Sequence, residues 1–197
     1  KRHKKVLQEE IPEIDLIVGV DEYDNIGEQL NNLFNSKLPK TYDPLKRSLS
    51  NPLPVAYLKI GEGCSNRCAY CAIPLMTGGY RSRNQEDIID EAKYLISQGV
   101  KEIQLIAQDL TYYGVDKSGV STIADLTKRL SDLDGLEWIR LHYGYPNDFP
   151  MDLLQVMRER DNVCNYMDLA LQHISHPVLE RMHRNITAEQ TRDLLAK

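Results

Sequence analysis

The chain has few cysteines, no long apolar run and no excess of basic residues, and each of these absences excludes a class of protein. Only four cysteines occur in 197 residues, and three of them lie too close together to form a disulfide framework. No stretch of about 18 apolar residues is present, so the sequence predicts no membrane-spanning helix. The formal net charge of −5 disfavours direct nucleic-acid binding by this segment.

Targeting signals and low-complexity tracts are also missing. The basic run at residues 1–5 is not followed by the apolar segment of a secretory signal. Together with the sparse cysteines, this predicts a cytoplasmic location and no membrane partner. The apolar fraction of 42% is sufficient for a packed core.

The first part of the chain differs in pattern from the rest. Residues 14–20 are nearly all apolar and predict a short buried strand, and residues 24–35 carry apolar side chains at helical spacing. Residues 38–54 hold four prolines and little periodicity. We therefore predict an interdomain linker at 38–54.

A regular alternation of strands and helices follows this linker. Each predicted strand is separated from the next by a stretch with helical periodicity, which predicts βα units and a parallel sheet. The predicted strands begin near Val55, Glu102, Glu137 and Tyr166, and the predicted helices cover 85–98, 123–133 and 151–159. The predicted fold is α/β, a partial TIM-like (β/α) barrel of about four βα units. Such barrels place their sites at the carboxyl ends of the strands.

Three cysteines follow the first of these strands with the spacing C-x3-C-x2-C. They are Cys64, Cys68 and Cys71, and no fourth cysteine lies near them. A closed structural zinc site and an ordinary iron–sulfur carrier both need four ligands, so three thiolates leave one position open. A zinc site completed by a distant histidine (His142, His173, His176 or His183) and a C-x2-C redox pair are the alternatives. Cys164 fits a small buried apolar residue better than a ligand.

The cysteine spacing resembles that of the radical S-adenosylmethionine superfamily. Tyr70 fits the resemblance, because an aromatic residue often precedes the third cysteine there. The resemblance implies that the three thiolates hold three irons of a [4Fe–4S] cluster. The fourth iron would bind S-adenosylmethionine, whose reductive cleavage yields a 5′-deoxyadenosyl radical.

Longer stretches are similar to the methylthiotransferase branch of this superfamily. They are residues 55–79 and 103–114. Within the branch, Arg81-Ser-Arg83, 107–109 and 140–146 are more similar to the members that modify a ribosomal protein than to those that modify tRNA. This closer resemblance implies transfer of a methylthio group to the β-carbon of an aspartate in a small-subunit ribosomal protein (S twelve). An electron donor such as flavodoxin would be a second partner. A tRNA adenosine substrate, or a non-enzymatic iron–sulfur or zinc-binding module, are the alternatives.

The resemblance also implies which residues bind the cofactors. Cys64, Cys68 and Cys71 would be the metal ligands, with no catalytic residue beyond the cluster. The residues implied to contact S-adenosylmethionine are Tyr70, Gln108, Asp109, Arg140 and Gln172.

The chain departs from the family pattern at both ends. The family binds a second [4Fe–4S] cluster through three cysteines of an N-terminal domain, but no cysteine precedes Cys64 here. We therefore expect residues 1–37 to be the tail of that domain, 38–54 a linker and 55–197 an incomplete radical domain. The family continues through two more βα units and a small β-barrel. We expect the segment alone not to complete the methylthiotransferase reaction.

Overall fold

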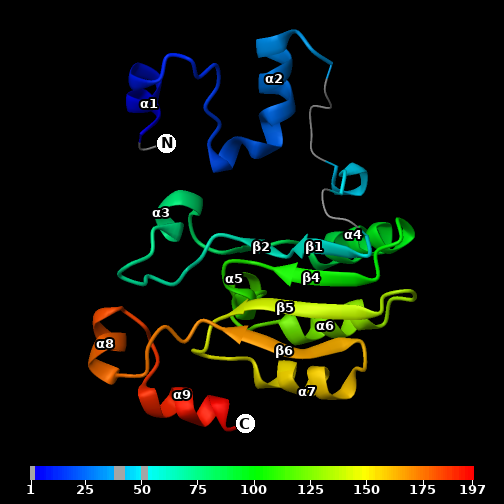
Figure 1. Cartoon of the computed structure of the whole chain (residues 1–197), viewed down its shortest axis with the longest axis vertical. Helices are drawn as coiled ribbons and strands as arrows, with labels where there is room; N and C mark the ends of the chain where they lie inside the picture. Colours follow the sequence, from blue (N-terminus) through cyan, green and yellow to red (C-terminus); the bar gives the residue numbers. More distant parts are fainter. Residues whose placement is uncertain (1–2, 38–42, 50–52) are drawn as a thin grey trace. The chain divides into compact units, whose positions relative to one another are not determined.

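The structure is a computed structural model that describes residues 3–37, 43–49 and 53–197. The chain divides into two compact units, Lys1–Arg47 and Ser48–Lys197 (Figure 1). The predicted linker at 38–54 includes 38–42 and 50–52, which lie outside the described residues. Its boundaries therefore stay a prediction.

In the described part of the first unit, all regular structure is helical. α1 spans Lys4–Glu10, the 3-10 helix η1 spans Val20–Asn25, α2 spans Ile26–Phe34, and a single 3-10 turn, η2, spans Pro44–Lys46. The predicted helix at 24–35 is thus confirmed. The predicted strand at 14–20 is wrong, because residues 14–19 adopt no regular structure and η1 begins at Val20. A strand needs a partner for its backbone N–H and C=O groups, and the described residues of this unit contain only helices and loops.

The second unit is built on a parallel sheet of four strands within the described residues. The strands are β1 (Val55–Lys59), β4 (Glu102–Ile106), β5 (Trp138–Gly144) and β6 (Val163–Leu169), in the spatial order β1-β4-β5-β6. All three pairings are parallel. The four strands thus have the same order in space as in the sequence. This order is typical of a (β/α) barrel, whereas the strand order of a doubly wound sheet reverses at one point. The predicted α/β fold is confirmed.

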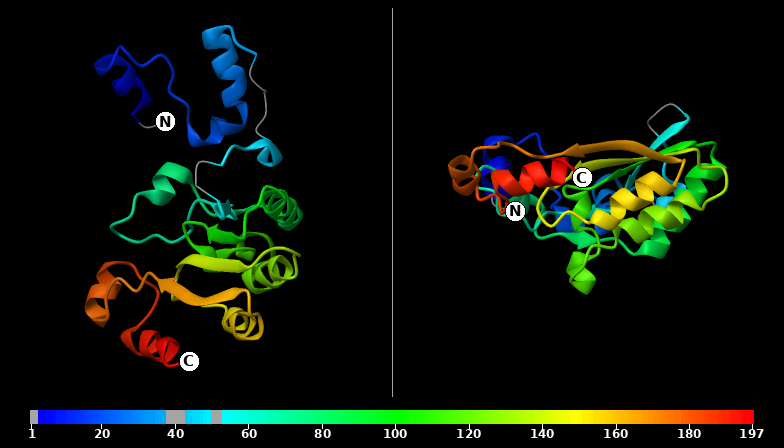
Figure 2. Two further views of the ribbon diagram at one scale, coloured as in Figure 1. Left: turned by 45° about the vertical axis from the view of Figure 1, so that its right-hand side comes forward. Right: turned by 90° about the horizontal axis from the view of Figure 1, so that it is seen from below.

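Three helices cover one face of this sheet, as Figure 2 shows. α4 (Gln85–Ser97), α6 (Ile123–Ser131) and α7 (Met151–Glu159) each follow a strand of the sheet or connect two of them. These are the three helices predicted from apolar periodicity. Their buried side chains pack against every second residue of the strands, which forms the core. The central core residues are Leu58, Leu105, Leu141, Ile88, Leu95, Leu126, Leu130 and Leu153.

Within the described residues of the second unit, no such helix covers the other face of the sheet, which carries the alternate side chains. Most of these are larger polar or amphipathic groups, half-buried or exposed. They are Tyr57, Lys59, Glu102, Gln104, Arg140, His142, Tyr166 and Asp168. In a closed (β/α) barrel this face points into the barrel. A polar inward face is suited to a ligand, whereas a barrel filled only for stability carries bulky apolar side chains there.

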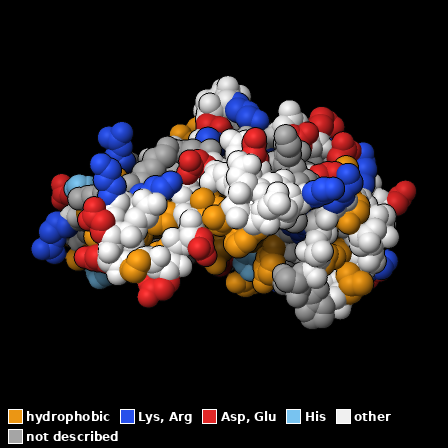
Figure 3. All heavy atoms as spheres, turned by 90° about the horizontal axis from the view of Figure 1, so that it is seen from above, with side chains coloured by type: hydrophobic (Ala, Val, Ile, Leu, Met, Phe, Trp, Pro, Cys, Tyr) orange, Lys and Arg blue, Asp and Glu red, His pale blue; other side chains and the backbone are white. Residues whose placement is uncertain are grey.

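Shorter elements lie between these strands and helices or follow them. A two-stranded antiparallel pair joins β2 and β3. The remaining elements are β2 (Gly61–Glu62), α3 (Ile73–Thr77), β3 (Arg81–Ser82), η3 (Leu110–Tyr112), α5 (Val115–Ser118), α8 (His176–Arg181) and α9 (Ala188–Leu195). None of the helices within the described residues is long and apolar enough to cross a bilayer. Basic and acidic side chains are interspersed on the face shown in Figure 3.

Candidate functional site

The cysteine loop leaves the carboxyl end of β1 and is closed at its base by backbone pairing. β2 pairs antiparallel with β3, and the Cys64 N–H donates to Gly78 O at 3.2 Å. α3 lies within the loop that these pairings close. The loop therefore begins and ends at the same point of the sheet, which is where a (β/α) barrel carries its site.

Gly63 permits the turn that brings Cys64 into place. Its φ is +82°, and a Cβ at this position would lie 2.4 Å from Gly79 O and 2.7 Å from Gly78 O. Both contacts are with backbone atoms, which cannot rotate away as a side chain would. Only glycine combines this φ with this close approach.

Substitution of Gly63 by alanine is expected to destabilise the protein by about 1–3 kcal/mol, because it adds a steric clash to left-handed strain. It should also lower the iron bound after anaerobic reconstitution. Urea unfolding and iron analysis measure the two effects. Gly119→Ala is the matched control, because Gly119 has φ +80° and a Cβ added there would meet nothing within 4 Å. Equal losses in the two variants would contradict the role of the close approach.

The three thiols differ in their surroundings. Cys64 is buried, and that burial raises the pKa of its thiol, whereas Cys68 and Cys71 are half-buried. A turn joins the last two, since the Cys71 N–H donates to Cys68 O at 3.1 Å. All three are free thiols. Cys164 is buried in β6, as predicted for a small apolar residue.

The thiols are not gathered around one ion position. Among the described residues, no group of three or more His, Cys, Asp or Glu side chains is arranged to hold a single metal ion. A cluster binds each thiolate through a separate iron, so its ligands need not converge on one point. The donor set, three thiols on one loop, is chemically suited to iron and sulfide.

Tyr70 lies in the same loop, half exposed, beside Cys68. Partial burial raises the pKa of its phenol, and the positive charge of Arg184 opposes that rise. Its ring is thus open to solvent next to the thiols. This placement is compatible with the predicted contact to the cofactor, which stays a prediction.

Asp109 connects the cysteine loop to the two neighbouring strand ends. Its carboxylate accepts hydrogen bonds from Asn66 Nδ2 at 2.7 Å and from Thr111 Oγ1 at 2.7 Å. The Thr111 Oγ1, whose single proton goes to Asp109, in turn accepts a hydrogen bond at 3.2 Å from the N–H of Tyr145, which follows β5. Asp109 is 3% exposed. Burial raises the pKa of its carboxyl, and the bonds from Thr111 and Asn66 oppose that rise. The geometry gives this predicted cofactor residue a structural role.

Replacing Asp109 by asparagine is expected to destabilise the protein by about 1–3 kcal/mol, because the new amide N–H₂ must face one of two donors. Both carboxylate oxygens accept in the native arrangement, so neither amide orientation preserves both bonds. Urea unfolding measures the loss. The control is Asp90→Asn on α4, whose carboxylate is 61% exposed in a pair with Lys93. A stability unchanged from wild type would mean that the loop does not depend on Asp109.

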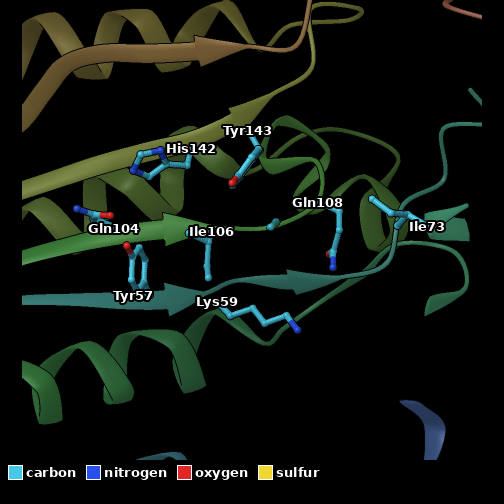
Figure 4. A pocket seen from close by; sticks show the side chains of 9 residues that line it. Tyr57, Lys59, Ile73, Gln104, Ile106, Gln108, His142 and Tyr143 are labelled. Atoms are coloured by element: carbon cyan, nitrogen blue, oxygen red, sulfur yellow. The ribbon is translucent and has the colours of Figure 1, made fainter. Parts of the chain in front are cut away.

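Gln108 lines a cavity of about 660 Å³ over the helix-free face of the sheet (Figure 4). This volume lies in the range of small-molecule sites, roughly 300–1,000 Å³. The Gln108 Nε2 donates to Glu62 Oε1 at 2.9 Å, and Glu62 also pairs with Lys59. The Gln108 Oε1 is buried and has no hydrogen-bond partner within the described residues. An orphaned buried acceptor is costly unless a ligand supplies a donor.

The residues that line the cavity come from three strands of the sheet and from the loops that follow them. Figure 4 shows its side chains arranged along the carboxyl halves of β1, β4 and β5. The other lining residues are Tyr57, Lys59, Ile73, Gln104, Ile106, Ala107, His142 and Tyr143. The His142 Nδ1 lies 3.6 Å from the Asp168 Oδ1. Sequence reasoning identified few of these residues, since alternation along a strand does not mark which polar residues face a ligand.

Two predicted cofactor residues lie elsewhere. Arg140 is in the first half of β5, where its Nε donates to Glu102 Oε1 at 2.9 Å and its guanidinium lies 5.5 Å from the Tyr166 ring centroid. Gln172 is exposed, with φ +64°, after the end of β6. The Arg140 guanidinium is therefore already paired with Glu102 of the same chain. The predicted contacts of Arg140 and Gln172 with the cofactor stay predictions.

Sequence reasoning missed Arg184 and Tyr145, both buried beside Cys68. The Arg184 Nη1 lies 3.6 Å and the Tyr145 hydroxyl 3.9 Å from the Cys68 Sγ. Tyr145 was within a stretch that carried the family resemblance. Arg184 had no local signal, because it lies in a loop 116 residues from its sulfur partner.

With this geometry established, comparison with known proteins places the chain in a family. The Radical SAM superfamily matches residues 58–197, which include the whole sheet beyond the start of β1. The chain belongs to the radical SAM superfamily. Membership implies a [4Fe–4S] cluster and S-adenosylmethionine as cofactors.

Curated relatives narrow the resemblance. The chain is 50% identical over 197 residues to the ribosomal protein uS12 methylthiotransferase RimO of Parabacteroides distasonis, covering 100% of this chain and 44% of that protein. It is 48% identical over 195 residues to RimO of Bacteroides fragilis, covering 99% and 44%. RimO of Geotalea uraniireducens is 45% identical over 206 residues, covering 100% and 46%. The chain thus spans less than half the length of these relatives.

Solved structures support the fold. A radical S-adenosylmethionine methyltransferase, TsrM of Kitasatospora setae, solved with cobalamin and a [4Fe–4S] cluster bound, matches with a TM-score of 0.55 at 19% identity. The match covers 72% of this chain and 28% of that one. The cobalamin-dependent radical enzyme OxsB matches with a TM-score of 0.55 at 14% identity, covering 71% and 21%.

Proposed function

We propose that the chain is the S-adenosylmethionine-cleaving part of an enzyme that transfers a methylthio group to the β-carbon of an aspartate in ribosomal protein uS12. The observation that supports this most strongly is the three-cysteine loop at the carboxyl end of β1, beside an open cavity. The identity of 45–50% to curated RimO proteins over nearly the whole chain supports the substrate.

The chain's own residues have distinct parts in this proposal. Cys64, Cys68 and Cys71 would hold three irons of the cluster. The unpartnered Gln108 Oε1 is an acceptor for a ligand donor, such as the amino group of S-adenosylmethionine. Tyr70, at the edge of the loop, offers an aromatic face to the adenine.

When bound, the cluster and S-adenosylmethionine supply reductive cleavage of a carbon–sulfur bond and a carbon-centred radical. The protein orients the ligand and keeps water from the reacting atoms. The apolar side of the cavity, which includes Ile73 and Ile106, serves the second purpose. The polar residues of β1 and β4 serve the first.

The remaining parts of the proposal concern the whole enzyme. We propose that residues 1–37 are the tail of a domain that carries a second [4Fe–4S] cluster, with 38–54 as linker and 55–197 as radical domain. An electron donor such as flavodoxin would reduce the clusters, and the ribosomal substrate would place the reaction in the cytoplasm.

Two measurements test the proposal. The anaerobically reconstituted protein should bind about four irons and convert S-adenosylmethionine to 5′-deoxyadenosine when dithionite is supplied. Stoichiometric zinc without iron would refute it. Mass spectrometry of ribosomal proteins and tRNA from a strain that lacks the gene identifies the substrate. Loss of a methylthio group from uS12 is expected, and its loss from tRNA alone would make tRNA the substrate.

A further inference from the structure

Arg184 is a buried cation to which the proposed function gives no part. Its side chain is 6% exposed, in the segment between α8 and α9. Arginine is rarely buried unless it is paired, yet none of the ion pairs among the described residues involves it. The Nε is buried without a hydrogen-bond acceptor in that part of the chain. Its burial therefore calls for another source of stabilisation.

Three groups surround the guanidinium instead of a carboxylate. It stacks on the Tyr145 ring at 3.8 Å from the centroid, and its Nη2 donates to Ala170 O. Its Nη1 lies 3.6 Å from the Cys68 Sγ, within N–H···S range. The planar fork of arginine allows stacking and donation at once, which lysine does not.

Tyr145 approaches the same sulfur from the sheet side. Its hydroxyl lies 3.9 Å from the Cys68 Sγ, and its backbone N–H donates to Thr111 Oγ1 at 3.2 Å. Cys68 thus faces one charged group, the Arg184 guanidinium, and two neutral ones, the hydroxyls of Tyr145 and the half-exposed Tyr70. By contrast, the groups that hydrogen-bond the Cys64 sulfur belong to Asn66, which is uncharged.

We propose that Arg184 and Tyr145 are positioning residues that hold Cys68 and raise the reduction potential of the cluster it binds. Donors to a ligand sulfur, and a positive charge beside it, stabilise the reduced cluster more than the oxidised one, because the reduced form carries more negative charge. This inference rests on the proposed function, since it needs a cluster on Cys68.

A purely structural role for Arg184 is the competing explanation. Its bond to Ala170 O ties the segment between α8 and α9 to the end of β6. The Ala69 N–H also donates to Met182 O at 3.0 Å, a second connection between this segment and the cysteine loop. Loss of a structural tie alone would change stability and leave the potential of an assembled cluster unchanged.

The test is an anaerobic redox titration of the reconstituted holoenzyme, followed by the electron paramagnetic resonance of the reduced cluster. The variants are R184Q, R184K and Y145F. We expect a shift to more negative potential in R184Q, a smaller shift in R184K, which keeps the charge, and a shift in the same direction in Y145F. R181Q is the matched control, because Arg181 is exposed on α8 and its Nε donates to Pro177 O. Its potential should equal that of wild type.

The outcomes separate this inference from the proposed function. A wild-type protein that binds no iron refutes the proposed function. If the wild-type protein binds a cluster and the potential of that cluster is unchanged in R184Q, R184K and Y145F, the inference alone is refuted, even where thermal stability falls. If R184Q assembles no cluster, R184K and Y145F decide.

Discussion

Replacing Cys68 by alanine is expected to abolish both cluster iron and S-adenosylmethionine cleavage, from about four irons per chain to background. The reason is the donor count. Each thiolate binds one iron of the cluster, so removal of Cys68 leaves two ligands for the three irons that need one. Iron and sulfide analysis, with chromatography of 5′-deoxyadenosine, measures the loss.

The chain supplies its own control for that experiment. Cys164 is the fourth cysteine, 5% exposed near the amino end of β6, whereas the cysteine loop lies at the carboxyl end of β1. Cys164→Ala should retain full iron and cleavage. Iron lost in this variant, or retained in Cys68→Ala, would contradict the ligand assignment. The same comparison applies to Cys64 and Cys71.

Leu105→Ala is expected to destabilise the protein by about 2–5 kcal/mol, the cost of a cavity at a fully buried leucine. Leu105 is 0% exposed in β4 and points toward the covering helices. A loss of this size is a large part of the stability of a domain, about 5–15 kcal/mol. Urea or thermal unfolding of the cluster-free protein measures it.

The neighbouring residue provides the matched comparison. Gln104 precedes Leu105 on β4 but points to the other face, where it lines the cavity. Gln104→Ala should change stability by less than about 1 kcal/mol and should weaken S-adenosylmethionine binding instead. Equal destabilisation by the two substitutions would contradict the assignment of one face to the core and one to the ligand.

The sheet and its three covering helices could be predicted because their patterns are local. Apolar spacing in 85–98 and 123–133 fixes a helical face without knowledge of the rest of the chain. The strand limit was less accurate at β6. The prediction began the fourth strand near Tyr166, whereas β6 begins at Val163. Register shifts between β5 and β6 interrupt the alternation from which limits are predicted.

In the site, too, the residues marked by a local sequence pattern could be predicted, and those brought together only by the fold could not. The three cysteines lie within eight residues of one another, so their spacing alone indicated a metal site. The buried Asp109 was predicted as a cofactor residue from the family resemblance, but its bonds to Asn66 and Thr111 are visible only in three dimensions. Arg184 could not be predicted, because its stacking on Tyr145 depends on the positions of two separate strand ends.

The bonds that shape the cysteine loop also bear on the order of folding. Asn66 and Asp109 are 43 residues apart, and Thr111 and Tyr145 are 34 residues apart. Contacts of this separation form late, because the chain between them must first be ordered. During synthesis the three cysteines emerge well before Tyr145. We therefore expect the cysteine loop to reach the shape described above only after the βα units that carry Asp109, Thr111 and Tyr145 have docked.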